Sequence, residues 1–139
     1  MKVLIPLDKN FNYLECRKMY EYYQSVINDD ASFDEVINNT FFYAFYDDEK
    51  LSLCVYFFLE NNKLWVNGYG IRKNHLFNKR AFLQALSWFN CDIWAISDKK
   101  PAIYGLLSCG FKKYEKNLYV YRQNNLSSAQ ERILYGKKF

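Results

Sequence analysis

Residues 64–122 read LWVNGYGIRKNHLFNKRAFLQALSWFNCDIWAISDKKPAIYGLLSCGFKKYEKNLYVYR, and this stretch decides the fold of the 139-residue chain. Its pattern predicts a strand, a helix, a second strand, a second helix and a closing hairpin, at residues 64–71, 79–89, 92–97, 102–109 and 111–122. A helix between two strands indicates a parallel crossover. We therefore expect the two strands to be parallel neighbours that splay apart at their carboxyl ends.

Capping and turn residues set the predicted helix boundaries. Asn78 can cap the first helix. The apolar face of that helix is formed by Phe82, Ala85, Leu86 and Phe89. Pro101 suits the first turn of the second helix, and Gly110 suits its C-terminal stop.

The residues before this stretch add further elements of both kinds. A strand, two helices and two antiparallel strands are expected at residues 2–7, 11–27, 33–37, 41–46 and 51–59. Ser32 and Glu35 have the spacing of a capping box before the second of these helices. The whole order predicts an α/β (α+β) fold, in which a mixed, mostly antiparallel sheet is flanked by helices.

Composition narrows the class of protein. Half of the residues are hydrophobic and 24% are charged, which indicates a single globular domain. The net charge of +4 permits an anionic ligand, but the basic residues are scattered, which disfavours a nucleic-acid partner. The first ten residues are too short and polar for a signal peptide or a membrane span. No metal site is expected, because the chain has one histidine and its cysteines lack metal-binding spacing. The same spacing favours reduced thiols in a cytoplasmic protein. The cysteines are Cys16, Cys54, Cys91 and Cys109.

The end of the second helix carries a short signature. Ala102 begins it, and Gly110 and Phe111 close it before the hairpin. This pattern and the element order resemble the GNAT superfamily of acyl-CoA-dependent N-acyltransferases, over about residues 1–122. The chain departs from that family at two positions, because Lys99 stands where the family has Asn and Leu106 stands where it has its Tyr general acid. Tyr104 is half a turn away and is predicted to face elsewhere.

The resemblance implies acetyl-CoA as the cofactor, with its phosphates in the loop after the fourth strand. The family has glycines in this loop, whereas residues 74–81 contain none. Strand N–H groups near Gly70 and Ile71 are expected to hold the oxyanion. Basic side chains would hold the phosphates in place of the glycine backbone, namely Arg72, Lys73, Lys79 and Arg80. The alternative is that these basic side chains are simply exposed to solvent at the start of a helix and bind no ligand.

Three residues are candidates for catalysis. His75, the one histidine, lies in the loop and could act as a general base. Asp98 follows a strand whose carboxyl end should open towards the ligand, so it could be a base or an anchor for the substrate amine. Glu60, at the end of the third strand, could have a similar role. Each could equally be an ordinary exposed loop or turn residue.

Two functions remain open at this point. The resemblance implies transfer of an acetyl group from acetyl-CoA to an amine in the cytoplasm. The alternative is a non-catalytic GNAT-fold interaction or assembly protein, for example a phage virion or morphogenesis protein that has lost acyl-CoA binding. Residues 123–139 form a predicted C-terminal extension, in which Ser128 and Glu131 suggest a short helix. That helix would pack on its own domain or dock to a protein partner.

Overall fold

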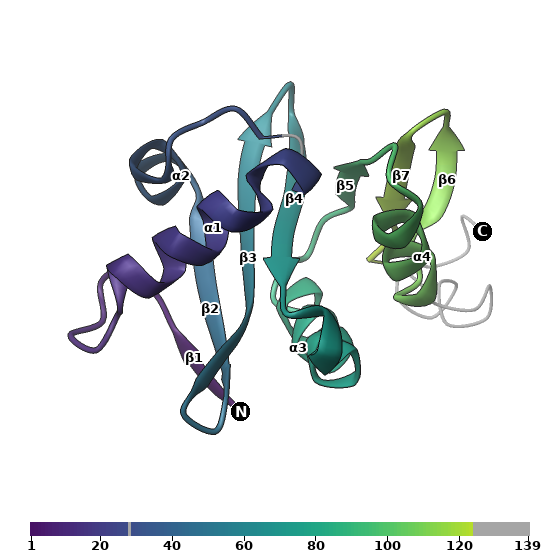
Figure 1. Cartoon of the computed structure of the whole chain (residues 1–139). Coiled ribbons are helices and arrows are strands. Elements are labelled where there is room, and N and C mark those ends of the chain that lie inside the picture. Colours follow the sequence, from purple (N-terminus) through teal and green to yellow (C-terminus); the bar gives the residue numbers. More distant parts are fainter. Residues whose placement is uncertain (28, 124–139) are drawn as a thin grey trace.

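The computed structural model describes residues 1–27 and 29–123, and Figure 1 shows them as one sheet flanked by helices. The strands are β1 (Lys2–Leu4), β2 (Phe41–Asp47), β3 (Lys50–Glu60), β4 (Lys63–Gly70), β5 (Ile93–Ile96), β6 (Lys112–Glu115) and β7 (Leu118–Tyr121). The helices are α1 (Tyr13–Ile27), α2 (Phe33–Asn39), α3 (His75–Leu86) and α4 (Lys100–Ser108), with a 3-10 turn η1 (Arg72–Asn74). The predicted helix of the C-terminal extension lies outside the described residues.

The strands form one sheet in the order β1-β2-β3-β4-β5-β7-β6. The pair β4 and β5 is parallel, and the other neighbouring pairs are antiparallel. This arrangement confirms the predicted mixed, mostly antiparallel sheet flanked by helices. It also confirms the parallel crossover, since α3 connects β4 to β5.

The two parallel strands separate soon after they meet. Leu64 pairs with Ile93 and Trp65 pairs with Trp94, where the parallel pairing ends. β4 then continues to Gly70 against β3, while β5 continues against β7. The predicted splay is therefore confirmed. Within the described part of the chain, one edge of β4 faces no strand over residues 66–70.

Both faces of the central strands are covered. The core under α3 contains Phe45, Val55, Phe57, Ala81, Ala85 and Leu86. The core under α1 and α2 contains Cys16, Tyr20, Phe33, Phe42, Tyr56 and Tyr69. In Figure 1, α1 crosses the face of the sheet, and it packs against β3 and β4. Burial on both faces explains why β2 and β3 are almost continuous apolar runs in the sequence rather than alternating ones.

The start of α3 differs from the prediction. The expected cap at Asn78 is wrong, because α3 begins at His75 and Asn78 lies within its first turn. The chain already turns helically in η1, where the Asn74 N–H donates to the Ile71 carbonyl oxygen at 3.0 Å. The side chain of Asn78 has a different role, which is described below.

Candidate functional site

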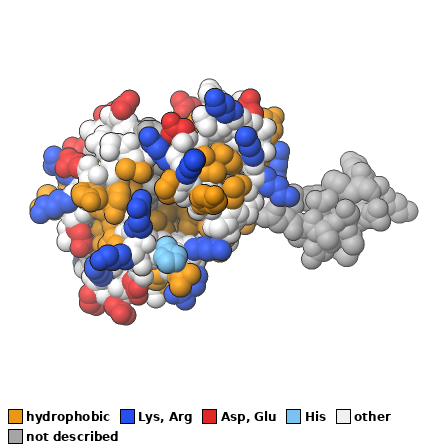
Figure 2. Space-filling model, turned by 45° about the vertical axis from the view of Figure 1, so that its right-hand side comes forward, with side chains coloured by type: hydrophobic (Ala, Val, Ile, Leu, Met, Phe, Trp, Pro, Cys, Tyr) orange, Lys and Arg blue, Asp and Glu red, His pale blue; other side chains and the backbone are white. Residues whose placement is uncertain are grey.

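A cleft of about 660 Å³ opens where β4 and β5 diverge. The edge of β4 lies along it, the first turns of α3 and the length of α4 form its walls, and the end of α1 reaches it from the other face of the sheet. Figure 2 shows hydrophobic side chains gathered around a hollow with Lys and Arg side chains at its border. The cleft is therefore lined by residues from both faces of the sheet.

The backbone of β4 directs N–H groups into this cleft. The Ile71 N–H donates to the Ser52 carbonyl oxygen at 2.9 Å and so points towards β3. Because successive N–H groups of a strand point to opposite edges, those of Gly68 and Gly70 point to the cleft. The Gly68 N–H donates there to the side-chain Oδ1 of Asn67 at 2.9 Å. The Ile71 N–H is therefore bonded to β3, and the strand N–H groups in this region that face the cleft are those of Gly68 and Gly70.

Side chains, rather than glycines, hold the loop between β4 and α3. The buried Ser52 hydroxyl donates to Asn78 Oδ1 at 2.6 Å and accepts from Asn74 Nδ2 at 2.9 Å. Asn78 Nδ2 donates to the Ile71 carbonyl oxygen at 3.0 Å. Asn74 Nδ2 also donates to Asp47 Oδ2 at 3.0 Å. The loop is thereby tied to the ends of β2 and β4 and to the interior of β3.

Gly70 is required by the close approach of α3 to β4. A Cβ atom at Gly70 would lie 2.8 Å from Asn78 Nδ2 and 3.0 Å from the Ser52 carbonyl oxygen. These distances are shorter than ordinary carbon contacts, so a side chain would push Asn78 away from its hydrogen bonds. The glycine therefore serves packing at this position.

Replacing Ser52 with alanine should destabilise the protein and loosen the loop. We expect the free energy of unfolding to fall by about 1–3 kcal/mol, because Asn78 Oδ1 and Asn74 Nδ2 each lose a partner in a buried place. Thermal unfolding followed by circular dichroism measures this loss. Ser87→Ala is the control, since the Ser87 hydroxyl donates to Gln84 O on an exposed helix end. Equal losses in both variants would contradict a special role for the loop network.

The charged side chains that line the cleft are cationic. Arg72 and Lys79 lie on its wall, with His75 beside them, and the described lining residues include no Asp or Glu. Arg80, which was also expected to bind the cofactor, is exposed and does not line the cleft. The N-terminus of α3 adds the positive end of a helix dipole. An anionic ligand therefore meets favourable charge at this end of the cleft.

The three candidate catalytic residues are not brought together. His75, the first residue of α3, lines the cleft. Asp98 is exposed, and it follows Ser97, which lines the cleft and is itself buried. Glu60 ends β3 at the opposite end of the ladder from Gly70. At about 3.3 Å per strand residue, that separation is roughly 20 Å. Of the three, His75 is the one that lines the cleft.

α4 presents two informative residues to the cleft. Leu106, at the position of the family's Tyr, lines it. Tyr104 also lines it, so the expectation that Tyr104 faces elsewhere is wrong. The reason is that Ile103 packs against the core, and the next residue on a helix is rotated by about 100°. Tyr104 is thereby turned towards the open side of the helix.

A tyrosine and a cysteine on the cleft wall are held in their neutral forms. The Tyr69 hydroxyl donates to the Cys16 carbonyl oxygen at 3.0 Å, and burial raises the pKa of Tyr69 far above its ordinary value. Burial also raises the pKa of the Cys109 thiol. Neither group is therefore a nucleophile or a proton acceptor at neutral pH.

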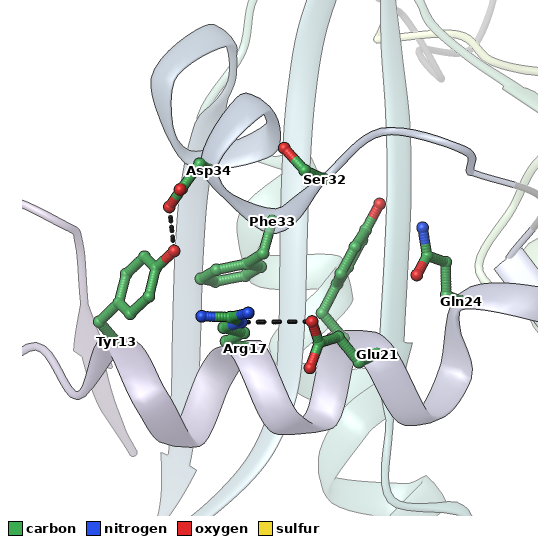
Figure 3. A pocket seen from close by; sticks show the side chains of 8 residues that line it. Tyr13, Arg17, Glu21, Gln24, Ser32, Phe33 and Asp34 are labelled. Atoms are coloured by element: carbon green, nitrogen blue, oxygen red, sulfur yellow. Dashed lines mark hydrogen bonds and ion pairs between the residues drawn. The ribbon is translucent and has the colours of Figure 1, made fainter.

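A smaller hollow of about 90 Å³ lies between α1 and α2 (Figure 3). There the Tyr13 hydroxyl donates to Asp34, and Arg17 Nε pairs with Glu21 at 3.2 Å. Phe33 is buried beside them. Because these charged groups satisfy one another, the hollow is a seam between two helices and not a ligand site.

Sequence reasoning missed two polar residues of the site. Ser52 interrupts the apolar run LSLCVYFFL, and Asn67 interrupts the strand LWVNGYG. A polar residue inside a strand that is buried on both faces signals a specific hydrogen bond. The sequence contains that signal, but it does not show which residues are the hydrogen-bond partners of Ser52 and Asn67.

Within residues 1–27 and 29–123, no group of three or more His, Cys, Asp or Glu side chains is placed to hold a metal ion. In the same ranges, the helices are too short or too polar to cross a bilayer.

No protein-family model matches the sequence, and no curated protein matches it. The structure is similar to an N-acetyltransferase from Staphylococcus aureus Mu50, with a TM-score of 0.63 and 12% identity over 90% of this chain and 100% of that one. It is also similar to the ribosomal-protein-S5-alanine acetyltransferase from Vibrio fischeri, with a TM-score of 0.58 and 11% identity over 90% and 94% of the two chains. A third similar structure is a Bacteroides thetaiotaomicron protein assigned to the GNAT family as an acetyltransferase, with a TM-score of 0.53 and 12% identity over 99% and 100%. The chain therefore has the GNAT fold.

Proposed function

We propose that the chain is an N-acetyltransferase that moves an acetyl group from acetyl-CoA to an amine. One observation carries this proposal: strand N–H groups and a cationic helix start meet in a single cleft between β4 and β5. Two of the similar structures named above are acetyltransferases and the third is assigned to the same class, which supports this class of reaction.

The residues of the cleft fit the cofactor. The volume of the cleft lies within the range of about 300–1,000 Å³ that is typical of cofactor sites. Arg72 and Lys79 would hold the phosphates, together with the N-terminus of α3. Apolar side chains on the walls, including those of Phe82 and Leu106, would hold the pantetheine arm.

The chain supplies two groups to the reaction. When bound, acetyl-CoA provides an acetyl group activated as a thioester. The N–H groups of Gly68 and Gly70 would donate to its carbonyl oxygen, where negative charge develops. For this, Gly68 must exchange Asn67 Oδ1 for the ligand. The proton that the amine releases would pass to solvent in the open cleft, because His75 lies beside Arg72 and Lys79, at the end where the phosphates would bind.

Calorimetric titration of the full chain with acetyl-CoA tests the proposal. We expect binding at low salt that weakens as salt is added, because Arg72 and Lys79 are exposed and their charges are screened. Release of the CoA thiol in the presence of amines then measures transfer. Absence of binding at low salt would overturn the proposal, and binding without thiol release would reduce it to an acyl-CoA-binding protein.

A second candidate is a GNAT-fold interaction or assembly protein without acyl-CoA binding. Leu106 favours it, because this side chain lines the cleft at the position of the family's proton donor and cannot give up a proton. The same titration separates the two candidates, since only the transferase requires acetyl-CoA to bind.

A further inference from the structure

The rim of the cleft carries exposed apolar side chains that the proposed cofactor site does not use. Val26 on α1 is 51% exposed, Ile96 on β5 is 69% exposed and Tyr104 on α4 is 73% exposed. All three line the same cleft, although they come from elements far apart in the sequence. Apolar side chains that gather at an opening are typical of a binding surface.

The polar groups on this side of the cleft include two hydrogen-bond acceptors, the Ile27 carbonyl oxygen and Asn67 Oδ1. α1 ends here at Ile27, and its last turn contains no basic residue, so its carboxyl end keeps its partial negative charge. Asn67 is a residue of β4, and its side chain connects the strand to this helix end: Asn67 Nδ2 donates to the Ile27 carbonyl oxygen at 3.4 Å, and Asn67 Oδ1 accepts from the Gly68 N–H. Such a group of acceptors is complementary to an amine.

The opposite end of the cleft has the opposite charge. Arg72 and Lys79 line it at the start of α3. A polycationic acceptor would bring further positive charge towards these residues, and it would leave the apolar rim exposed to water. An acceptor with a single amine on an apolar body would cover the apolar rim and would bring little positive charge towards Arg72 and Lys79.

We propose that the acceptor of this enzyme is a primary amine carried on an aromatic body. The aromatic ring packs among Val26, Ile96 and Tyr104, where the Tyr104 ring offers edge or stacked contacts. The amine is received by Asn67 and the carboxyl end of α1, beside the Gly68 N–H. This inference rests on the proposed function, because it names the substrate that the same cleft takes.

Direct binding of 2-phenylethylamine to the full chain is the first measurement. Saturation-transfer NMR should detect it without acetyl-CoA, whereas ethanolamine and spermidine should give much weaker signals. In the presence of acetyl-CoA, 2-phenylethylamine should also accelerate thiol release more than either polar amine does.

A matched pair of double variants locates the site. Val26→Ser with Ile96→Ser should weaken 2-phenylethylamine binding roughly tenfold or more, since removing apolar contacts in a pocket has effects of that size. The control is Leu14→Ser with Leu59→Ser, which alters side chains 62% and 72% exposed on α1 and on a strand, outside the cleft. The control should bind the amine as the natural chain does, and both doubles should keep their affinity for acetyl-CoA.

The outcomes separate the two proposals. Acetyl-CoA binding without 2-phenylethylamine binding, or faster transfer to spermidine, would overturn the acceptor class and leave the transferase. Equal effects of the two double variants would also overturn it. Absence of acetyl-CoA binding would overturn the transferase and the acceptor class with it.

Discussion

Replacing both Arg72 and Lys79 with alanine should weaken acetyl-CoA binding at least a hundredfold. Both side chains line the cleft where α3 begins, and no other Lys or Arg among the described lining residues remains to offset their loss. A hydrogen bond to a charged group contributes about 1.5–3 kcal/mol, and about 1.4 kcal/mol corresponds to a factor of ten in affinity. Calorimetric titration at low salt measures the change.

Lys73 and Arg80 provide a matched control. They lie on η1 and α3, carry the same total charge, and do not line the cleft. Replacing both with alanine should lower the affinity only a few-fold, through the long-range field. If the control pair costs as much affinity as Arg72 and Lys79, general positive charge holds the ligand and the phosphates do not bind on the cleft wall.

Raising the pH above 10 should unfold the protein steeply. Burial raises the pKa of Tyr56 and of Tyr69 far above the ordinary value of 10.0. Their contribution to stability is fully present below pH 10 and is lost above it, because the unfolded chain releases protons that the folded chain retains. Each such group lowers the free energy of unfolding by about 1.4 kcal/mol per pH unit, and Tyr20 and Tyr46 act in the same direction. A total stability of about 5–15 kcal/mol would then vanish within two to three pH units.

Single Tyr→Phe variants test which side chains cause this slope. Tyr56→Phe or Tyr69→Phe should make the melting temperature fall less steeply with pH above 10. The slope is the decisive quantity, because each variant also loses a hydrogen bond, to Asp29 or to the Cys16 carbonyl oxygen. Tyr22→Phe alters an exposed ring and should leave the slope unchanged. An unchanged slope in all three variants would show that other groups govern alkaline unfolding.

Local patterns in the sequence predicted the fold well. The Ser32 and Glu35 capping box is confirmed, with Glu35 N donating to Ser32 Oγ at 3.2 Å and Ser32 N donating to Glu35 Oε1 at 3.1 Å. Both partners lie within one turn, so the sequence contains the whole interaction. The parallel arrangement of the strands at residues 64–71 and 92–97 was likewise predicted from local patterns, as a helix between two strands.

The details of the site depend on partners that are distant in the sequence. Asn78 has the residue type and position of a helix cap, but its side chain bonds Ser52, 26 residues away. The direction of the Ile71 N–H depends on its register against β3, and a shift of one residue would reverse it. Whether the Arg80 side chain reaches the cleft likewise depends on the residue at which α3 begins. Spacing along the chain predicted the neighbourhood of the site but not the orientation of its groups.

The hydrogen-bond network around Ser52 has a consequence for how this loop evolves. A glycine-rich loop is encoded by a few consecutive residues, which can be inherited and recognised as one motif. Here the equivalent loop depends on residues spread from position 47 to position 78. A substitution at any of them alters the loop, and no single neighbouring position can compensate for it. Such a loop therefore leaves no compact motif in the sequence by which it could be recognised.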